Sequence, residues 1–250
     1  MLLEGVGALV AGGASGLGRA TAEAFRERGA DVTVLDLPQA RERVPDGSGL
    51  TFVAADVRDA RAVEEAIAVA SRASALRVCV NCAGIGPPAR ILRRGVPHAL
   101  EAFQEIVDVN LVGTFNVMRL AAAAMRDNDP WNGERGVIVN TASVAAYDGQ
   151  IGQAAYAASK GGIVSLTLTA ARDLADVLVR CVTIAPGLFE TPLLKVLPDA
   201  ARASLAAAVP HPHRLGDPRE YAALATHIVE NPMLNGEVVR LDGALRMAPR

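Results

Sequence analysis

The chain has 250 residues, of which 51% are hydrophobic, and this is enough to bury one large core. Its 25 basic and 27 acidic residues give a formal net charge of −2 and form no long basic run, so nucleic-acid binding is not expected. The apolar pair Leu2 and Leu3 is too short for a signal peptide, and charged residues interrupt every Ala-rich stretch. We therefore expect a cytoplasmic protein that has no membrane-spanning helix.

Short apolar runs alternate along the chain with longer helical patterns. Runs of valine, isoleucine and alanine that are joined by helical crossovers are typical of a parallel sheet covered on both faces. We therefore predict one doubly wound α/β domain of the Rossmann type over residues 1–250, with helices on both faces of a seven-stranded parallel sheet. The seven predicted strands are 6–11, 32–35, 51–54, 78–80, 137–140, 182–184 and 238–241.

Two stretches do not follow this alternation. Residues 87–97 are rich in arginine and show no clear periodicity, while residues 186–218 combine several prolines with short apolar runs. Both follow predicted strand ends, and open α/β sheets bind their ligands beyond the carboxyl ends of the strands. We expect them to form the walls of a substrate site, with 186–218 as the substrate loop. Ordinary surface insertions are the alternative interpretation.

Cys79 and Cys82 match the C-x-x-C spacing of redox and metal sites. The predicted strand 78–80 would direct them to opposite faces, and no second cysteine pair completes a zinc site. His211 and His213 flank a proline and have no obvious partner ligand, so we interpret them as loop residues. No metal site is predicted.

A glycine-rich turn follows the first predicted strand. Gly12, Gly16 and Gly18 stand where a helix begins at Leu17, which is the context expected of a phosphate-binding turn. The glycines allow the backbone to approach a phosphate, Ser15 can donate a hydrogen bond to it, and the helix N-terminus favours the pyrophosphate of a dinucleotide. A plain glycine-rich turn is the alternative.

Asp36 closes the second predicted strand. A carboxylate at this place binds the ribose hydroxyls of a dinucleotide and repels a 2′-phosphate. The residue that follows it is Leu37 and not an arginine, so NAD is favoured over NADP as the cofactor. Arg41 and Arg43 lie nearby in the sequence and weaken this inference slightly.

Tyr156 and Lys160 are four residues apart in a predicted helix, thirteen residues beyond Ser143. On one helix face, an ammonium would lie beneath the phenol and acidify it. At roughly 4 Å the charge could lower the pKa of the phenol by up to about three units, and desolvation would oppose this. The pair predicts an acid/base catalyst for hydride transfer. The alternative makes Tyr156 a packing residue.

These features resemble the short-chain dehydrogenase/reductase family over essentially the whole chain. The matching motifs are the glycine turn, 81–84, Asn110, Ser143, Tyr156 with Lys160, and 186–187. The resemblance implies that Tyr156 is the catalytic acid/base, that Lys160 lowers its pKa and holds the nicotinamide ribose, and that Ser143 hydrogen-bonds the substrate oxygen. It also implies that Asn110 anchors a water molecule leading from Lys160 to solvent.

Further positions carry over by matching motif. The resemblance implies that Gln153 faces the substrate. It also implies three groups of cofactor contacts: Asp56 and Val57 at the adenine, Cys82, Ala83 and Gly84 beside the adenine ribose, and Pro186, Gly187, Phe189 and Thr191 facing the nicotinamide. An aspartate at a strand end can also be a simple turn residue.

The longest shared runs are with family members that act on 3-hydroxyacyl-CoA and are also described as 17β-hydroxysteroid dehydrogenases. They imply an NAD-dependent oxidoreductase for a 3-hydroxyacyl-CoA or a related secondary alcohol such as a hydroxysteroid. A 3-oxoacyl carrier-protein reductase and an NAD-binding sensor or scaffold are the alternatives. The resemblance also implies a homotetramer, with its interface around 163–174 and Leu241.

Overall fold

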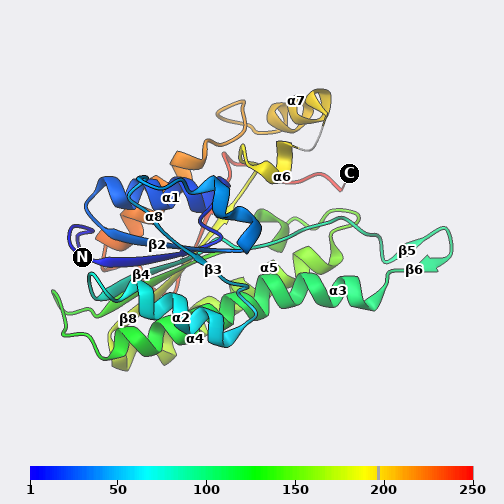
Figure 1. Cartoon of the computed structure of the whole chain (residues 1–250). Coiled ribbons are helices and arrows are strands. Elements are labelled where there is room, and N and C mark those ends of the chain that lie inside the picture. Colours follow the sequence, from blue (N-terminus) through cyan, green and yellow to red (C-terminus); the bar gives the residue numbers. More distant parts are fainter. Residues whose placement is uncertain (196–197, 250) are drawn as a thin grey trace.

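The computed structural model describes residues 1–195 and 198–249 and contains the predicted seven-stranded parallel sheet (Figure 1). The strand order is β3-β2-β1-β4-β7-β8-β9, and every adjacent pair is parallel. The strands are β1 (Gly7–Ala11), β2 (Asp31–Asp36), β3 (Thr51–Ala54), β4 (Leu76–Asn81), β7 (Gly136–Thr141), β8 (Val179–Pro186) and β9 (Val238–Leu241). All seven predicted strands are confirmed.

Helices cover both faces of the sheet (Figure 1). On one face lie α1 (Gly16–Glu27) and α8 (Pro218–Glu230), which pack against each other. On the other face lie α2 (Ala60–Ala70), α4 (Gly113–Arg126) and α5 (Ala154–Asp173). A further helix, α3 (Leu100–Val107), runs into α4 through a π-helical turn, Asp108–Val112. The doubly wound fold class is therefore confirmed.

The two faces of β1 belong to two different apolar cores. Ala8 and Val10 point into the cluster that contains Phe25 of α1 and Ile228 of α8. Their neighbours Leu9 and Ala11 point into the cluster beneath α2 and α4. A strand buried on both faces has no polar side to display, which explains why it reads as an unbroken apolar run.

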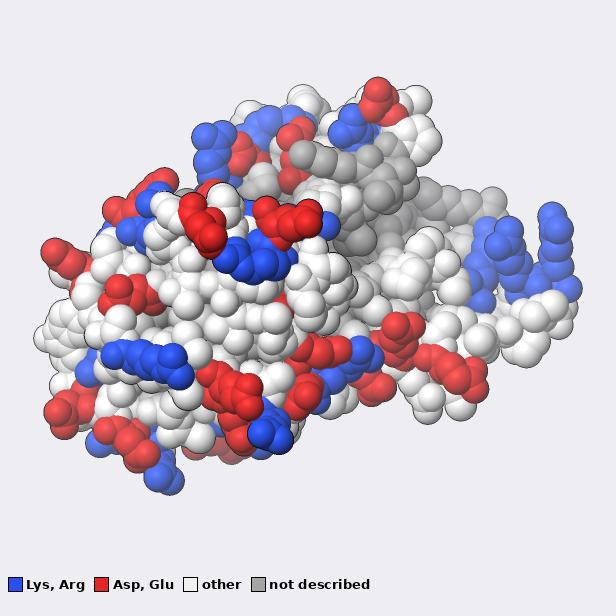
Figure 2. Space-filling model, in the orientation of Figure 1, with Lys and Arg blue, Asp and Glu red and all other residues white. Residues whose placement is uncertain are grey.

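Residues 87–97 contain a hairpin that the sequence did not reveal. Strands β5 (Leu92–Arg93) and β6 (Val96–Pro97) pair in antiparallel orientation and project from the body of the protein (Figure 1). Arg94 and Gly95 form the two-residue turn, with φ of 51° and 80°. A two-residue loop with two positive φ angles is usually marked by Asn-Gly or Asp-Gly, and Arg-Gly carries a much weaker signal. Figure 2 shows basic side chains gathered on this projection.

The region 186–218 forms two short helices, α6 (Pro192–Lys195) and α7 (Asp199–Ala207), with residues 196–197 outside the described residues. The Ala-rich pattern of 200–208 is typical of a packing face, and the helix is present. None of the residues of α7, all of which are described, is buried. The alanines of α7 therefore favour a helix without being buried in the core.

The helical stretch Leu100–Arg126 is long and apolar enough to pass a length-and-composition test for a membrane span. Its most apolar window has a mean hydropathy of 1.3, and half of that window is buried inside the protein. A core helix that packs on a sheet passes the same test, so this finding is weak evidence for a membrane segment.

Candidate active site

A cavity of about 550 Å³ opens at the carboxyl ends of the strands, where the strand order reverses between β1 and β4. This is the place at which open α/β sheets bind ligands. The predicted positions that line it are Gly12, Ser15, Gly16, Leu17, Gly18, Asp36, Asp56, Val57, Cys82, Ala83, Gly84, Ser143, Gln153, Tyr156, Lys160, Pro186, Gly187, Phe189 and Thr191. The structure thus brings together residues that follow the carboxyl ends of β1, β2, β3, β4, β7 and β8.

The glycine turn fits a pyrophosphate. Gly12 has φ of +73°, and a Cβ there would lie 2.5 Å from the backbone nitrogen of Ala83. A Cβ on Gly18 would lie 2.2 Å from the carbonyl oxygen of Gly12, so neither position tolerates a side chain. Among the described residues, the Ser15 side chain makes no capping hydrogen bond to α1, and the first turn of that helix carries no carboxylate. The first N–H groups of α1 and the Ser15 hydroxyl are therefore available to bind an anion in the cavity.

The Asp36 carboxylate is held beside this turn. Its Oδ2 accepts a hydrogen bond from the backbone N–H of Ala14 at 3.0 Å, and its Oδ1 accepts one from Leu37 at 2.9 Å. Each oxygen keeps a lone pair for a ribose hydroxyl. The Arg41 guanidinium is engaged by Asp46 and by the face of Phe52, 5.6 Å from the ring centroid.

The predicted adenine contacts lie at the same end of the cavity. The Asp56 carboxylate forms an ion pair with Arg58 at 2.6 Å, and hydrogen bonds from this guanidinium lower the pKa of Asp56. The carbonyl oxygen of Val57 accepts a hydrogen bond from the Asn116 side chain at 2.8 Å. Arg58 also lines the cavity, and it is not among the predicted site residues.

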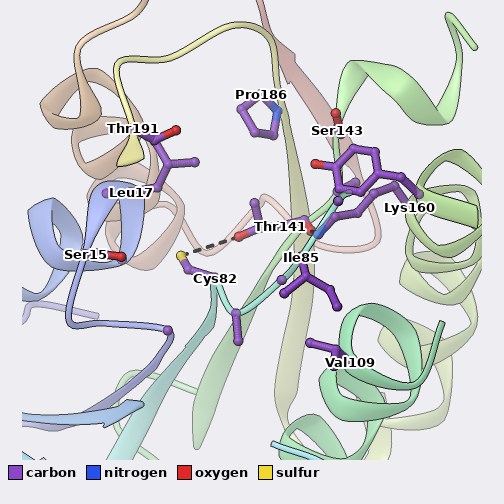
Figure 3. A pocket seen from close by; sticks show the side chains of 18 of the residues that line it. Ser15, Leu17, Cys82, Ile85, Val109, Thr141, Ser143, Lys160, Pro186 and Thr191 are labelled. Atoms are coloured by element: carbon purple, nitrogen blue, oxygen red, sulfur yellow. Dashed lines mark hydrogen bonds between the residues drawn. The ribbon is translucent and has the colours of Figure 1, made fainter. Parts of the chain in front are cut away.

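Cys82 belongs to a buried polar cluster under the cavity floor. The Thr141 hydroxyl lies 2.7 Å from the Tyr221 hydroxyl and donates to the Cys82 Sγ at 3.5 Å (Figure 3). Burial raises the pKa of the Cys82 thiol, which keeps it neutral. Cys79 is a separate buried thiol, and no group of three potential metal ligands occurs within residues 1–195 and 198–249.

Lys160 lies beneath Tyr156, as the four-residue spacing predicts. Its Nζ is 5.8 Å from the centroid of the Tyr156 ring and donates a hydrogen bond to the Thr141 carbonyl at 2.8 Å. Burial lowers the pKa of Lys160 to about 8. Figure 3 shows Lys160 and Ser143 converging on one part of the cavity.

In the protein alone, the net pKa of Tyr156 is raised and not lowered. Burial raises the pKa of the Tyr156 phenol, and a hydrogen bond with Ser143 opposes this only in part. The ammonium sits below the ring and is directed at the Thr141 carbonyl, so desolvation is the larger effect.

Asn110 is fully buried behind the cavity wall. Its side chain accepts a hydrogen bond from the Ile85 N–H and donates one to the Ile85 carbonyl, both at 2.8 Å, and it also donates to Ser159 at 3.0 Å. A Cβ added to Gly84 would lie 3.1 Å from the Asn110 oxygen and 3.5 Å from the Lys160 Nζ. Asn110 thus clamps the segment after β4, and its role as a water anchor stays a prediction.

The end of the cavity near Tyr156 is lined by residues of several loops. The Gln153 Oε1 is buried and has no hydrogen-bond partner among the described residues, so it is available to a ligand. Gln150 and Met247 also line the cavity, and neither is among the predicted site residues, whereas Leu188 belongs to the predicted substrate loop at 186–218. Nothing in the local pattern marked Met247, because its position depends on how a distant segment folds back.

The arrangement provides acid/base chemistry at an oxygen. A substrate oxygen placed between the Ser143 hydroxyl and the Tyr156 phenol can accept a hydrogen bond from one and exchange a proton with the other. Lys160 places a cation close to both. A nicotinamide, when bound, supplies the hydride acceptor or donor for the carbon of the same group. The residues present at the turn and at Asp36 fit such a dinucleotide.

Known proteins resemble this chain over most of its length. A protein-family model described as short chain dehydrogenase matches residues 7–201. The human protein 3-hydroxyacyl-CoA dehydrogenase type-2 is 53% identical over 254 residues, which is 99% of this chain and 97% of that protein. The protein of the same name from Drosophila melanogaster is 51% identical, with 99% and 100% covered. A crystal structure of 3-hydroxyacyl-CoA dehydrogenase type-2 from Mycobacterium avium superposes with a TM-score of 0.94 at 43% identity and covers 98% of each chain.

Proposed function

Because this chain belongs to the short-chain dehydrogenase family and is a nicotinamide-dependent dehydrogenase, we propose that its cofactor is NAD and that its substrate is a 3-hydroxyacyl-CoA. The observation that carries the proposal is the joint lining of one cavity by Ser143, Tyr156 and Lys160 at one end and by Asp36 at the other. The names of the relatives at 51% and 53% identity support the substrate class.

In the oxidative direction the Tyr156 phenolate takes the proton of the substrate hydroxyl while hydride leaves the carbon. Ser143 stabilises the alkoxide that develops on the oxygen. The Lys160 ammonium, held by the Thr141 carbonyl at 2.8 Å, favours the phenolate electrostatically once the site is complete. Gln153 lines the same cavity, and its Nε2 group can donate a hydrogen bond to the thioester carbonyl of the substrate.

The substrate proposal is tested by following nicotinamide absorbance during the reduction of acetoacetyl-CoA. Turnover of acetoacetyl-CoA with NADH supports the proposal. Turnover only of a carrier-protein thioester with NADPH would instead identify a 3-oxoacyl carrier-protein reductase. Tight NADH binding without turnover of any thioester or hydroxysteroid would indicate a sensor or scaffold.

Replacing Asp36 by alanine is expected to reduce the preference for NADH over NADPH by at least about tenfold, which is about 1.4 kcal/mol. The carboxylate that pairs with ribose hydroxyls and repels a 2′-phosphate is then lost, together with the hydrogen bond that it accepts from the Ala14 N–H of the turn. Fluorescence titration of the two reduced cofactors measures the ratio of dissociation constants. Asp31→Ala, at the exposed opposite end of β2, is the matched control and should keep the wild-type ratio. An unchanged ratio in Asp36→Ala would contradict the NAD assignment.

We also propose a homotetramer, and the exposed residue Leu168 lies within the expected interface region 163–174. Ile163 is fully buried in the core, so it cannot contribute to an interface. Phe115 of α4 and Leu168 of α5 are each 47% exposed and offer apolar surface on that side of the sheet. Sedimentation equilibrium is expected to give four copies per particle, and introducing charge with Phe115→Glu should dissociate it. A wild-type monomer at micromolar concentration would exclude the tetramer.

A further inference from the structure

The segment 245–249 folds back across the sheet to reach the loop that precedes α5. Leu245 anchors it in the protein interior, where only 2% of its surface is exposed. Beyond this anchor, the side chain of Gln150 donates a hydrogen bond to the Ala248 carbonyl at 3.1 Å, and the N–H of Ile151 donates to the Pro249 carbonyl at 3.1 Å. The end of the segment, at Ala248 and Pro249, is therefore joined to residues 150–151.

An ion-pair clamp holds the beginning of this segment. Arg240, at the end of the sheet, bonds Asp148 at 2.8 Å and Asp242 at 2.8 Å, and it donates to the Leu245 carbonyl at 3.0 Å. Asp148 in turn accepts a hydrogen bond from the N–H of Met247 at 3.3 Å. One guanidinium thus fixes both the loop and the segment that lies on it.

The clamp places the half-buried Met247 side chain at the Tyr156 end of the cavity. Met247 lines the cavity together with Gln150 and Gln153. The N–H of Gln153 donates to the Gln150 carbonyl at 3.1 Å, and Gln153 is the N-cap residue of the helix that carries Tyr156. The Gln150 side chain also donates a hydrogen bond to the carbonyl of Ala248, the residue next to Met247. Met247 is therefore tied to the reacting end of the cavity and not to the glycine turn.

Neighbouring side chains in this part of the cavity are apolar. Leu188 and Leu194, both half-buried, line the same cavity as Met247. An apolar wall beside polar Gln150 and Gln153 fits a ligand that carries an alkyl chain next to a polar carbonyl group. The methionine side chain is unbranched and can adapt to alkyl chains of different shapes.

We propose that Met247 is a specificity-determining residue: the clamped 245–249 segment holds its side chain at the Tyr156 end of the cavity, where it limits the length and branching of the acyl chain. This inference rests on the proposed function, since it takes the ligand to be an acyl thioester. It assigns chain selection to a segment far in sequence from the substrate loop at 186–218.

The test compares kcat/KM for a series of 3-oxoacyl-CoA thioesters, from acetoacetyl-CoA to longer straight chains and a 2-methyl-branched chain. Met247→Trp is expected to lower kcat/KM for the longest and the branched thioesters at least about tenfold more than for acetoacetyl-CoA, because one methylene in an apolar pocket already changes selectivity by about 10- to 200-fold. Met247→Ala is expected to shift the preference in the opposite direction. The dissociation constant of NADH should change in neither variant.

Met233→Trp is the matched control. It introduces the same substitution at a residue that is 90% exposed and does not line the cavity. Asp148→Asn is a second variant that weakens the clamp without touching the cavity wall, and it should flatten the chain-length profile. If the wild type is active and the chain-length profiles of kcat/KM for Met247→Trp and Met233→Trp both equal its profile, the proposal for Met247 is wrong and the proposed function stands. A wild type that turns over no thioester would remove the proposed function, and the role of Met247 in acyl selection with it.

Discussion

Tyr156→Phe is expected to lower kcat by at least about 10³-fold while leaving the dissociation constant of NADH nearly unchanged. The change removes only the phenolic oxygen, which is the group positioned to exchange a proton with the substrate, and proton transfer by such a group contributes typically ~10²–10⁴-fold. Phenylalanine keeps the aromatic ring. This ring packs closely on Gly86, since a Cβ added to Gly86 would lie 2.9 Å from it. Steady-state kinetics with acetoacetyl-CoA measure kcat, and fluorescence titration measures cofactor binding.

The pH dependence of the wild type gives an independent test of the same assignment. Burial raises the pKa of Tyr156 in the protein alone, so oxidation, which needs the phenolate, should accelerate as the pH rises. Reduction needs the protonated phenol and should slow over the same range. Tyr147→Phe is the matched control, because Tyr147 is 46% exposed and should tolerate the loss of its hydroxyl. Retained turnover in Tyr156→Phe, with an unaltered pH profile, would exclude Tyr156 as the acid/base.

Most of the sheet and nearly all of the cofactor site could be predicted from the sequence. Strands buried on both faces are apolar without interruption, so the run at 6–11 and the six others were visible as strands. The residues after their carboxyl ends, such as Asp36 and Cys82, then had to meet at one edge of the sheet. Local pattern and parallel topology together were sufficient for this part of the cavity.

The remainder depends on contacts between residues far apart in the chain. Met247 lines the cavity in a segment that is held by long-range contacts, such as the ion pair between Arg240 and Asp148, which are separated by 92 positions. The direction of the Tyr156 pKa also required the structure, because spacing places Lys160 on the same helix face but does not reveal burial or the Thr141 carbonyl. Neither effect has a periodic signature in the sequence.

Lys160→Met is expected to abolish most of the activity and to change how stability depends on pH. The ammonium of Lys160 is buried, and its pKa is lowered from 10.5 to about 8 by desolvation. At pH 7 the folded protein therefore contains a buried charge, which costs about 3 kcal/mol at ~1.4 kcal/mol per unit of pKa shift. Methionine has a similar length and carries no charge, so the variant escapes this cost.

The sign of the effect follows from proton binding. Between pH 8 and about 10.5 the unfolded chain keeps a proton on Lys160 that the folded protein has lost, so the stability of the wild type rises with pH relative to the variant. Between pH 7 and pH 10, the free energy of unfolding of the wild type should rise by about 2–3 kcal/mol relative to that of Lys160→Met. Denaturant unfolding without cofactor measures both values. The variant also loses the hydrogen bond to the Thr141 carbonyl. This loss changes the free energy of unfolding by the same amount at pH 7 and at pH 10. Between pH 6 and pH 7 the difference should stay constant, which serves as the control. A constant difference up to pH 10 would mean that Lys160 keeps an ordinary pKa, and the electrostatic account of the site would then fail.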